Sequence, residues 1–116
     1  VFAYGWLPQF RVIEMMKTAG VYAYPGGPMP EGFGVSLVQA QACGLEVVAP
    51  SAGALPEVLV PRAGGAISDE TFLGSLVTSL QSPLIDAVRK EQSKMTLARH
   101  AWPVVANRFL ELTGLT

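Results

Sequence analysis

Residues 30–34, with the sequence Pro-Glu-Gly-Phe-Gly, place a carboxylate and two glycines directly before a predicted helix. Glycine lets the backbone approach a ligand closely, and the unused amides at a helix start can hold an anion. The Glu31 carboxylate can accept hydrogen bonds from ligand hydroxyls. Together these groups suit a sugar phosphate or a nucleotide sugar. The alternative is plain turn chemistry, in which Glu31 only complements the helix dipole.

Other chemistries are poorly matched. The Gly-Lys-Ser/Thr of a phosphate-binding P-loop is absent, and Leu37 stands where a dinucleotide fingerprint needs its third glycine. The single cysteine excludes an internal disulfide and a cysteine-based zinc site, so no metal is expected. Neither Cys43 nor His100 has a catalytic partner nearby in the sequence. Cys43 is predicted to pack on the sheet, and His100 to lie at the surface or to pack.

The positioning elements follow from apolar runs bounded by glycine and proline. They predict short strands over residues 1–4, 21–24, 46–49 and 65–67. Helices are predicted over residues 11–19, 34–43, 55–59, 84–100 and 103–112, and one more begins at about residue 69 with Ser68 as its N-cap. The apolar stripe predicted for that last helix is Phe72, Leu73, Leu76, Val77 and Leu80.

This alternation predicts an α/β fold, a Rossmann-like parallel sheet with helices on both faces. In such sheets ligands bind at the carboxyl ends of the strands. The candidate ligand edge is therefore residues 25–34 together with residues 50–57.

Composition narrows the choice of partners. The chain has 116 residues, 50% hydrophobic and 15% charged, with a net charge of −1. A broad basic surface for nucleic acid or an anionic membrane is absent. No apolar stretch approaches the roughly 18 residues of a membrane span. We therefore expect neither a nucleic-acid partner nor a membrane span. One cysteine fits a reducing compartment, so we expect a cytoplasmic location.

Several motifs in a fixed order resemble the C-terminal, donor-binding domain of retaining glycosyltransferases of the glycogen-synthase and mannosyltransferase type, group 1, which share the GT-B fold. The resemblance covers nearly the whole chain. Its main motifs are Val21-Tyr-Ala-Tyr-Pro25, Glu31-Gly-Phe-Gly34, Gln39-Ala-Gln-Ala-Cys-Gly44, Glu46-Val-Val-Ala49 and Gly53-Ala-Leu-Pro-Glu57.

The resemblance implies roles for individual residues. Glu31 matches the first glutamate of the family's E-x7-E motif. In the family this glutamate holds the donor-sugar hydroxyls, so Glu31 is the candidate catalytic residue. The second glutamate, which grips the nucleotide ribose, is replaced here by Gln39. The segment implied to lie against the donor sugar and diphosphate consists of Gly32, Phe33, Gly34, Val35 and Ser36.

The resemblance also implies parts that the sequence does not contain. Two further strands and an N-terminal acceptor domain are expected beyond residues 1–116, which would form one partial domain with C-terminal helices from about 69 to 112. Because the two strands would pair between residues 1–4 and residues 21–24, we expect residues 1–4, when the chain stands alone, to be displaced, to pair differently or to pair with a strand of a neighbouring molecule.

The leading hypothesis is a donor domain that binds a UDP-, GDP- or ADP-sugar for retaining transfer, without a cofactor and inactive by itself. Gln39 favours an alternative, a non-catalytic relative that serves as a binding or interaction module. A sugar epimerase of the same two-domain architecture is the other alternative.

Overall fold

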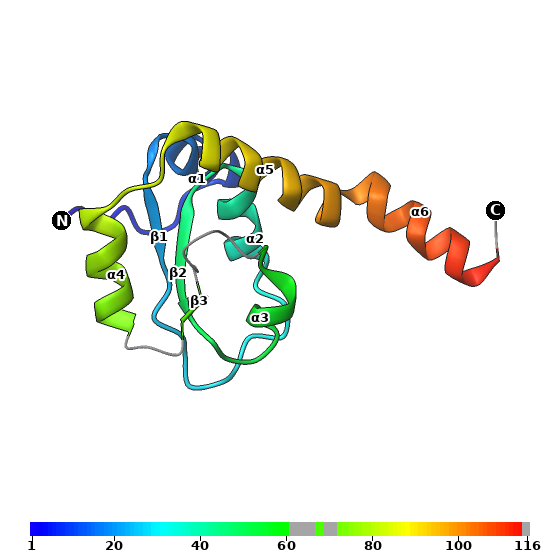
Figure 1. Ribbon diagram of the computed structural model, residues 1–116, viewed down its shortest axis with the longest axis horizontal. Helices are drawn as coiled ribbons and strands as arrows, with labels where there is room; N and C mark the ends of the chain where they lie inside the picture. Colours follow the sequence, from blue (N-terminus) through cyan, green and yellow to red (C-terminus); the bar gives the residue numbers. More distant parts are fainter. Residues whose placement is uncertain (61–66, 69–71, 115–116) are drawn as a thin grey trace.

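The computed structural model describes residues 1–60, 67–68 and 72–114 (Figure 1). In chain order the elements are α1 (Gln9–Thr18), β1 (Val21–Ala23), α2 (Val35–Ala42), β2 (Glu46–Pro50), α3 (Leu55–Val58), β3 (Ile67–Ser68), α4 (Phe72–Gln81), α5 (Asp86–His100) and α6 (Trp102–Thr113). The expected alternation of strands and helices is therefore present from residue 9 onwards.

The sheet is parallel, and β2 lies in its centre between β1 and β3. Val21 pairs with Glu46 at the start of β1, and Ala49 pairs with Ile67 on the other side of β2. The amide of Tyr24 also donates to the carbonyl of Val48 at 2.9 Å, which extends the pairing one residue beyond β1. Of the predicted strand at residues 65–67, only Ile67 falls within the described residues.

Helices cover both faces of the sheet, as the sequence predicts. Neighbouring residues of a strand point to opposite faces. Val47 packs into the main core with α2, whereas the carboxylate of Glu46 accepts a 2.5 Å hydrogen bond from Ser79 on α4. Figure 1 shows α2 and α4 on opposite sides of β2. The buried members of the core are Met16, Leu37, Ala40, Leu45, Val47, Ala49, Leu55 and Leu59.

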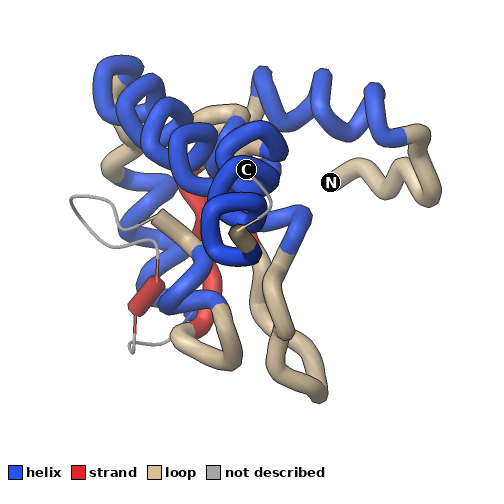
Figure 2. The backbone as a smooth tube through the Cα atoms, turned by 90° about the vertical axis from the view of Figure 1, so that its right-hand side faces the viewer, coloured by secondary structure: helices blue, strands red, loops and turns tan. Residues whose placement is uncertain are grey.

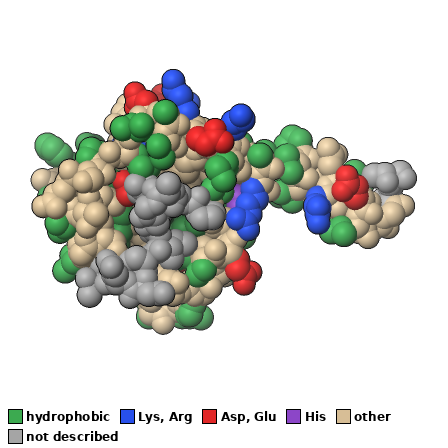
Figure 3. All heavy atoms as spheres, in the orientation of Figure 1, with side chains coloured by type: hydrophobic (Ala, Val, Ile, Leu, Met, Phe, Trp, Pro, Cys, Tyr) green, Lys and Arg blue, Asp and Glu red, His purple; other side chains and the backbone are tan. Residues whose placement is uncertain are grey.

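The last two helices differ in how they are held. α5 lies across the end of α2, where the Gln92 amide donates to the Leu45 carbonyl at 2.6 Å and the Ser93 hydroxyl to the Ala42 carbonyl at 2.5 Å. α6 buries none of its residues and projects from the rest of the molecule (Figure 3). Large apolar side chains such as Trp102 and Phe109 are exposed on it. This projection gives the chain its longest dimension, 49 Å.

The predicted strand at residues 1–4 is wrong. These residues have no regular structure, and Phe2 and Tyr4 are exposed. A run of strand formers becomes a strand only beside a partner, and no described strand pairs with it. The expectation that this segment is displaced from the sheet agrees with the structure.

The predicted apolar stripe of α4 is also partly wrong. Leu73, Val77 and Leu80 are exposed, while the polar Ser79 is buried. The helix is rotated so that Ser79 meets Glu46, a contact that an apolar periodicity does not encode. Ser68, the predicted N-cap of this helix, lies in β3 and pairs with Pro50, and the predicted start at about residue 69 lies outside the described residues.

Across the described ranges, no helix combines the length and the apolar character that crossing a membrane requires.

Candidate functional site

The loops that follow β1 and β2 leave the sheet at the same end of the molecule (Figures 1 and 2). They enclose a cavity of about 270 Å³, which we call the loop cavity. Tyr24 and Glu31 line it from the first loop, and Pro50, Ala52 and Leu55 line it from the second loop and α3. The structure thus joins the two segments that the sequence analysis assigned to one ligand edge.

Backbone contacts fix Glu31 against the second loop. The amide of Ala54 donates to the carbonyl of Glu31 at 3.0 Å. Gly53 allows this approach, since a Cβ atom there would lie 2.5 Å from the same carbonyl oxygen. Its φ of +58° also belongs to the left-handed region that favours glycine. A Gly-Ala turn after β2 is therefore required to place the Glu31 backbone.

Tyr24 holds the carboxylate of Glu31. Its phenol donates to Oε1 of Glu31 at 2.7 Å, across the half-buried wall of the loop cavity. This hydrogen bond, and burial second, raise the pKa of Tyr24 above 10.0, so the phenol remains a donor at neutral pH. Within the described part of the chain, no group donates to the other carboxylate oxygen. That oxygen can accept from a ligand hydroxyl.

The sequence analysis did not identify Tyr24 as a site residue. In the sequence, Tyr24 is only the last residue of the strand predicted over residues 21–24. Its position at the carboxyl end of that strand is the signal that could have found it, because that is the expected ligand edge.

The start of α2 presents unused backbone donors next to Glu31. Gly34 is the N-cap with a φ of +82°, and a Cβ atom there would lie 2.8 Å from Cδ2 of Leu55. The Gly34 carbonyl accepts from Leu37 and Val38, both at 3.1 Å. Within the described residues, the amides of residues 32–36 have no protein acceptor. Such amides at a helix start can bind an anion.

Ser36 faces the sheet through its side chain. Its hydroxyl accepts from the phenol of Tyr22, on β1, at 3.2 Å. The Ser36 hydroxyl keeps its own hydrogen free to donate.

The remaining predicted residues line a different cavity. An apolar groove of about 550 Å³ runs between α2, α5 and α6, and its lining includes Phe33, Val35 and Gln39. Trp102 and Val105 form its wall on α6. The structure therefore separates the predicted set, with Glu31 in the loop cavity and Gln39 in the groove.

Cys43 and His100 pack as predicted. Nε2 of His100 lies 2.7 Å from the carbonyl of Val58. The imidazole ring packs edge-to-face with the ring of Phe33, with 5.6 Å between the ring centroids. Cys43 is half-buried at the end of α2, 57 residues before His100 in the chain, and the two line different cavities. In the described part of the chain, no group of three His, Cys, Asp or Glu side chains could hold a metal ion.

Comparisons with known proteins point in one direction. The family model for glycosyl transferases group 1 matches residues 1–97. A GDP-mannose-dependent monoacylated alpha-(1-6)-phosphatidylinositol monomannoside mannosyltransferase of Corynebacterium glutamicum is 28% identical over 120 residues, 93% of this chain and 31% of the relative. A D-inositol 3-phosphate glycosyltransferase of Mycolicibacterium smegmatis is 33% identical over 79 residues, 66% of this chain and 18% of the relative.

The chain thus spans less than a third of the length of these two relatives. No solved structure gives a significant match.

Proposed function

Because the chain belongs to the group 1 glycosyl transferases, we propose that it forms the donor-binding part of a glycosyltransferase. It binds a nucleoside-diphosphate sugar, and the sugar passes with retention of anomeric configuration to an acceptor held by another domain. In this proposal the chain alone is inactive, because the acceptor site lies elsewhere in the protein.

The arrangement around Glu31 is the observation that carries the proposal. The carboxylate is held by Tyr24 at 2.7 Å, and the unpaired amides of residues 32–36 follow it directly. A nucleotide sugar presents the two matching groups side by side, namely hydroxyls for the carboxylate and a diphosphate for the amides. A sugar phosphate carries both groups as well, and membership of the group 1 glycosyl transferases favours the nucleotide sugar.

The chemistry asked of these residues is positioning and charge stabilisation. Glu31 would orient the donor sugar through its hydroxyls. The amides at the start of α2 would stabilise the charge that develops on the leaving diphosphate. Backbone donors supply this stabilisation in the proposal, so neither a metal ion nor a cofactor is assigned to the site.

The sequence leaves UDP-, GDP- and ADP-sugars as donors. The relative from Corynebacterium glutamicum is described as GDP-mannose-dependent, which makes GDP-mannose the first donor to test.

Gln39 favours a second candidate function, a binding module without transferase activity. A carboxylate at this position is implied by the family motif, and the chain has an amide instead. In the structure Gln39 lines the apolar groove and not the loop cavity. A protein that lost the ribose contact would keep the fold and lose donor affinity.

Calorimetric titration of GDP-mannose, UDP-glucose and ADP-glucose into the intact protein separates these functions. We expect one nucleotide sugar to bind and to support transfer. Glu31→Ala should lower the transfer rate roughly 10- to 150-fold, since charge-assisted hydrogen bonds contribute about 1.5–3 kcal/mol. Glu91→Ala is the matched control, because Glu91 is an exposed carboxylate on α5 that does not line the loop cavity. Absence of binding by all three donors would contradict the proposal.

A further inference from the structure

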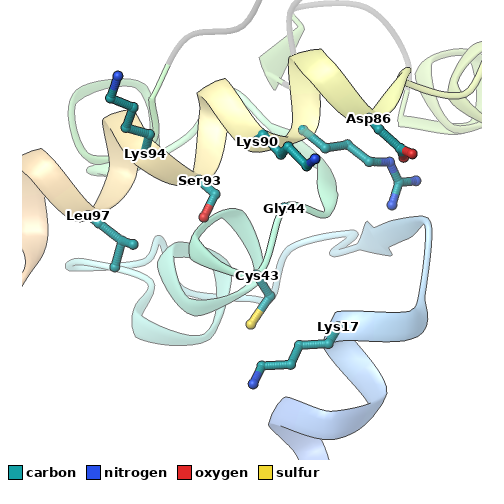
Figure 4. A pocket seen from close by; sticks show the side chains of 9 residues that line it. Lys17, Cys43, Gly44, Asp86, Lys90, Ser93, Lys94 and Leu97 are labelled. Carbon is teal, nitrogen blue, oxygen red and sulfur yellow. The ribbon is translucent and has the colours of Figure 1, made fainter.

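A third cavity, of about 560 Å³, lies at the opposite end of the sheet from the loop cavity. The last turn of α1, the end of α2 and the first three turns of α5 form its walls (Figure 4). We call it the basic pocket. α2 has eight residues and is therefore about 12 Å long, so the two cavities lie near opposite ends of this helix.

Positive charge is concentrated in this pocket. Four of the chain's eight lysines and arginines line it, namely Lys17, Arg89, Lys90 and Lys94. In the described part of the lining, Asp86 is the only acidic side chain. The whole chain carries a net charge of −1, so this local excess of cations is not a property of the general surface. A concave surface lined by one sign of charge attracts counter-ions.

The arginine is fixed and the lysines are available. The Arg89 guanidinium donates to the carbonyls of Ala19 and Gly20, both at 3.2 Å, which holds its charge at the turn between α1 and β1. Among the described residues, Lys17, Lys90 and Lys94 form no ion pair. Their ammonium groups can therefore contact a ligand without breaking an existing interaction.

Cys43 lies between the two sources of lysines. Figure 4 shows it between Lys17 on α1 and Lys90 on α5, whereas the side chain of Lys94 extends away from it. Burial raises the pKa of the Cys43 thiol, and the charge of Lys17 offsets this only in part. The thiol is therefore mainly neutral at neutral pH and supplies no anion to compensate the lysines.

We propose that the basic pocket binds a small phosphate-bearing anion at a site separate from the loop cavity. Unpaired ammonium groups on two helices, around a cavity of this volume, match a compact, multiply charged group. A nucleic acid would need a wider basic surface than four side chains provide. The same chemistry is carried by soluble phosphate compounds and by the phosphorylated headgroup of an anionic lipid.

Cys43 is the only cysteine of residues 1–116, and its alkylation, followed on the peptide that contains it, offers a local measurement of occupancy. The experiment follows its alkylation by the neutral reagent iodoacetamide in the intact protein, with inorganic pyrophosphate as the probe and potassium chloride at equal ionic strength as the reference. A bound anion would cover the thiol and disfavour its thiolate. We expect alkylation to be about tenfold slower when pyrophosphate is present at about ten times its dissociation constant.

The double variant Lys17→Gln, Lys90→Gln should lose this protection. Both side chains are exposed on helices, so the variant is expected to fold, which circular dichroism checks. Arg108→Gln is the matched control, because it removes an exposed cation of α6 that does not line the pocket. Equal alkylation rates in pyrophosphate and chloride would overturn the proposal, and so would protection that persists in the double variant.

Sedimentation with vesicles distinguishes the two sources of phosphate. A lipid headgroup is the ligand if pyrophosphate protects Cys43 and the protein also binds phosphatidylinositol-containing vesicles. The double variant should then lose the vesicle binding. Pyrophosphate protection without vesicle binding identifies a soluble phosphate compound.

Discussion

Tyr24 and Glu31, seven residues apart in the chain, are joined by a 2.7 Å hydrogen bond from phenol to carboxylate. The bond closes the loop after β1 and leaves one carboxylate oxygen directed to other partners. The raised pKa of Tyr24 means that the bond is fully present below pH 10.0, the ordinary value, and is lost only as the pH rises through the raised pKa. The carboxylate is therefore held in one orientation throughout the neutral range.

Tyr24→Phe tests whether this orientation matters for transfer. The variant removes only the phenolic oxygen, so the fold should persist while Glu31 gains rotational freedom. We expect kcat to fall more than KM rises, because a misplaced carboxylate holds the sugar less often in the reactive orientation. Steady-state kinetics with the donor that the calorimetric titration identifies measure this split. Tyr4→Phe serves as the control, since Tyr4 is exposed in a segment without regular structure and does not line the loop cavity.

Gly53→Ala should disturb the site through the backbone. Its φ of +58° and the 2.5 Å approach of a Cβ atom to the Glu31 carbonyl both oppose a side chain. We expect a loss of about 1–3 kcal/mol in the free energy of unfolding, the typical magnitude of local backbone strain. Denaturant titration measures this loss. In Gly32→Ala the new Cβ atom meets nothing within 4 Å, so a similar loss in this control would contradict the explanation.

Gln41→Leu should be strongly destabilising although it replaces a polar side chain by an apolar one of similar size. Gln41 is fully buried. Its side-chain nitrogen donates to the carbonyl of Val60 at 3.0 Å, and its side-chain oxygen accepts from the backbone amide of Val60 at 2.9 Å. Each buried group left unpaired costs about 1–3 kcal/mol, which gives about 2–6 kcal/mol for the pair. Thermal and denaturant unfolding measure the loss. Gln81→Leu, at the exposed end of α4, should change stability little.

The sequence predicted the elements whose patterns are local. Glycine and proline bound β1 and β2, and the apolar run of β2 is buried as a central strand requires. These elements bring residues 25–34 and 50–57 to one edge, so the position of Glu31 could be predicted. The Tyr24–Glu31 bond could not, because it depends on the path of a loop with three prolines and two glycines between residues 25 and 30.

The errors have a common physical origin in contacts between distant segments. Residues 1–4 have strand propensity but no strand beside them, and propensity alone does not form a strand. The rotation of α4 is set by Ser79 against Glu46, which are 33 residues apart. The site prediction is not among these errors, but the lining of two cavities by Glu31 and Gln39 likewise depends on how α5 and α6 pack beside α2, which the sequence motif does not contain.

Gln39→Glu tests whether the apolar groove serves the nucleotide. If the ribose lies at position 39, a carboxylate accepts from both hydroxyls of its cis diol, whereas the present amide has one accepting oxygen. Charge-assisted bonds contribute about 1.5–3 kcal/mol against about 0.5–1.5 for neutral ones. After partial offset by repulsion from the diphosphate, the gain should be on the order of 1 kcal/mol, or roughly fivefold in affinity.

Calorimetric titration of GDP and UDP into both proteins measures this difference, and the melting temperature without ligand should barely change. Gln81→Glu is the matched control, because it adds the same charge at the end of α4, away from the groove. Unchanged affinity in Gln39→Glu would show that the ribose does not reach the groove and that position 39 packs against α5 and α6 only. Absence of binding by either protein would favour the binding module without transferase activity. Weaker binding by the variant would mean that the amide of Gln39 donates to its ligand, since a carboxylate cannot replace a donor.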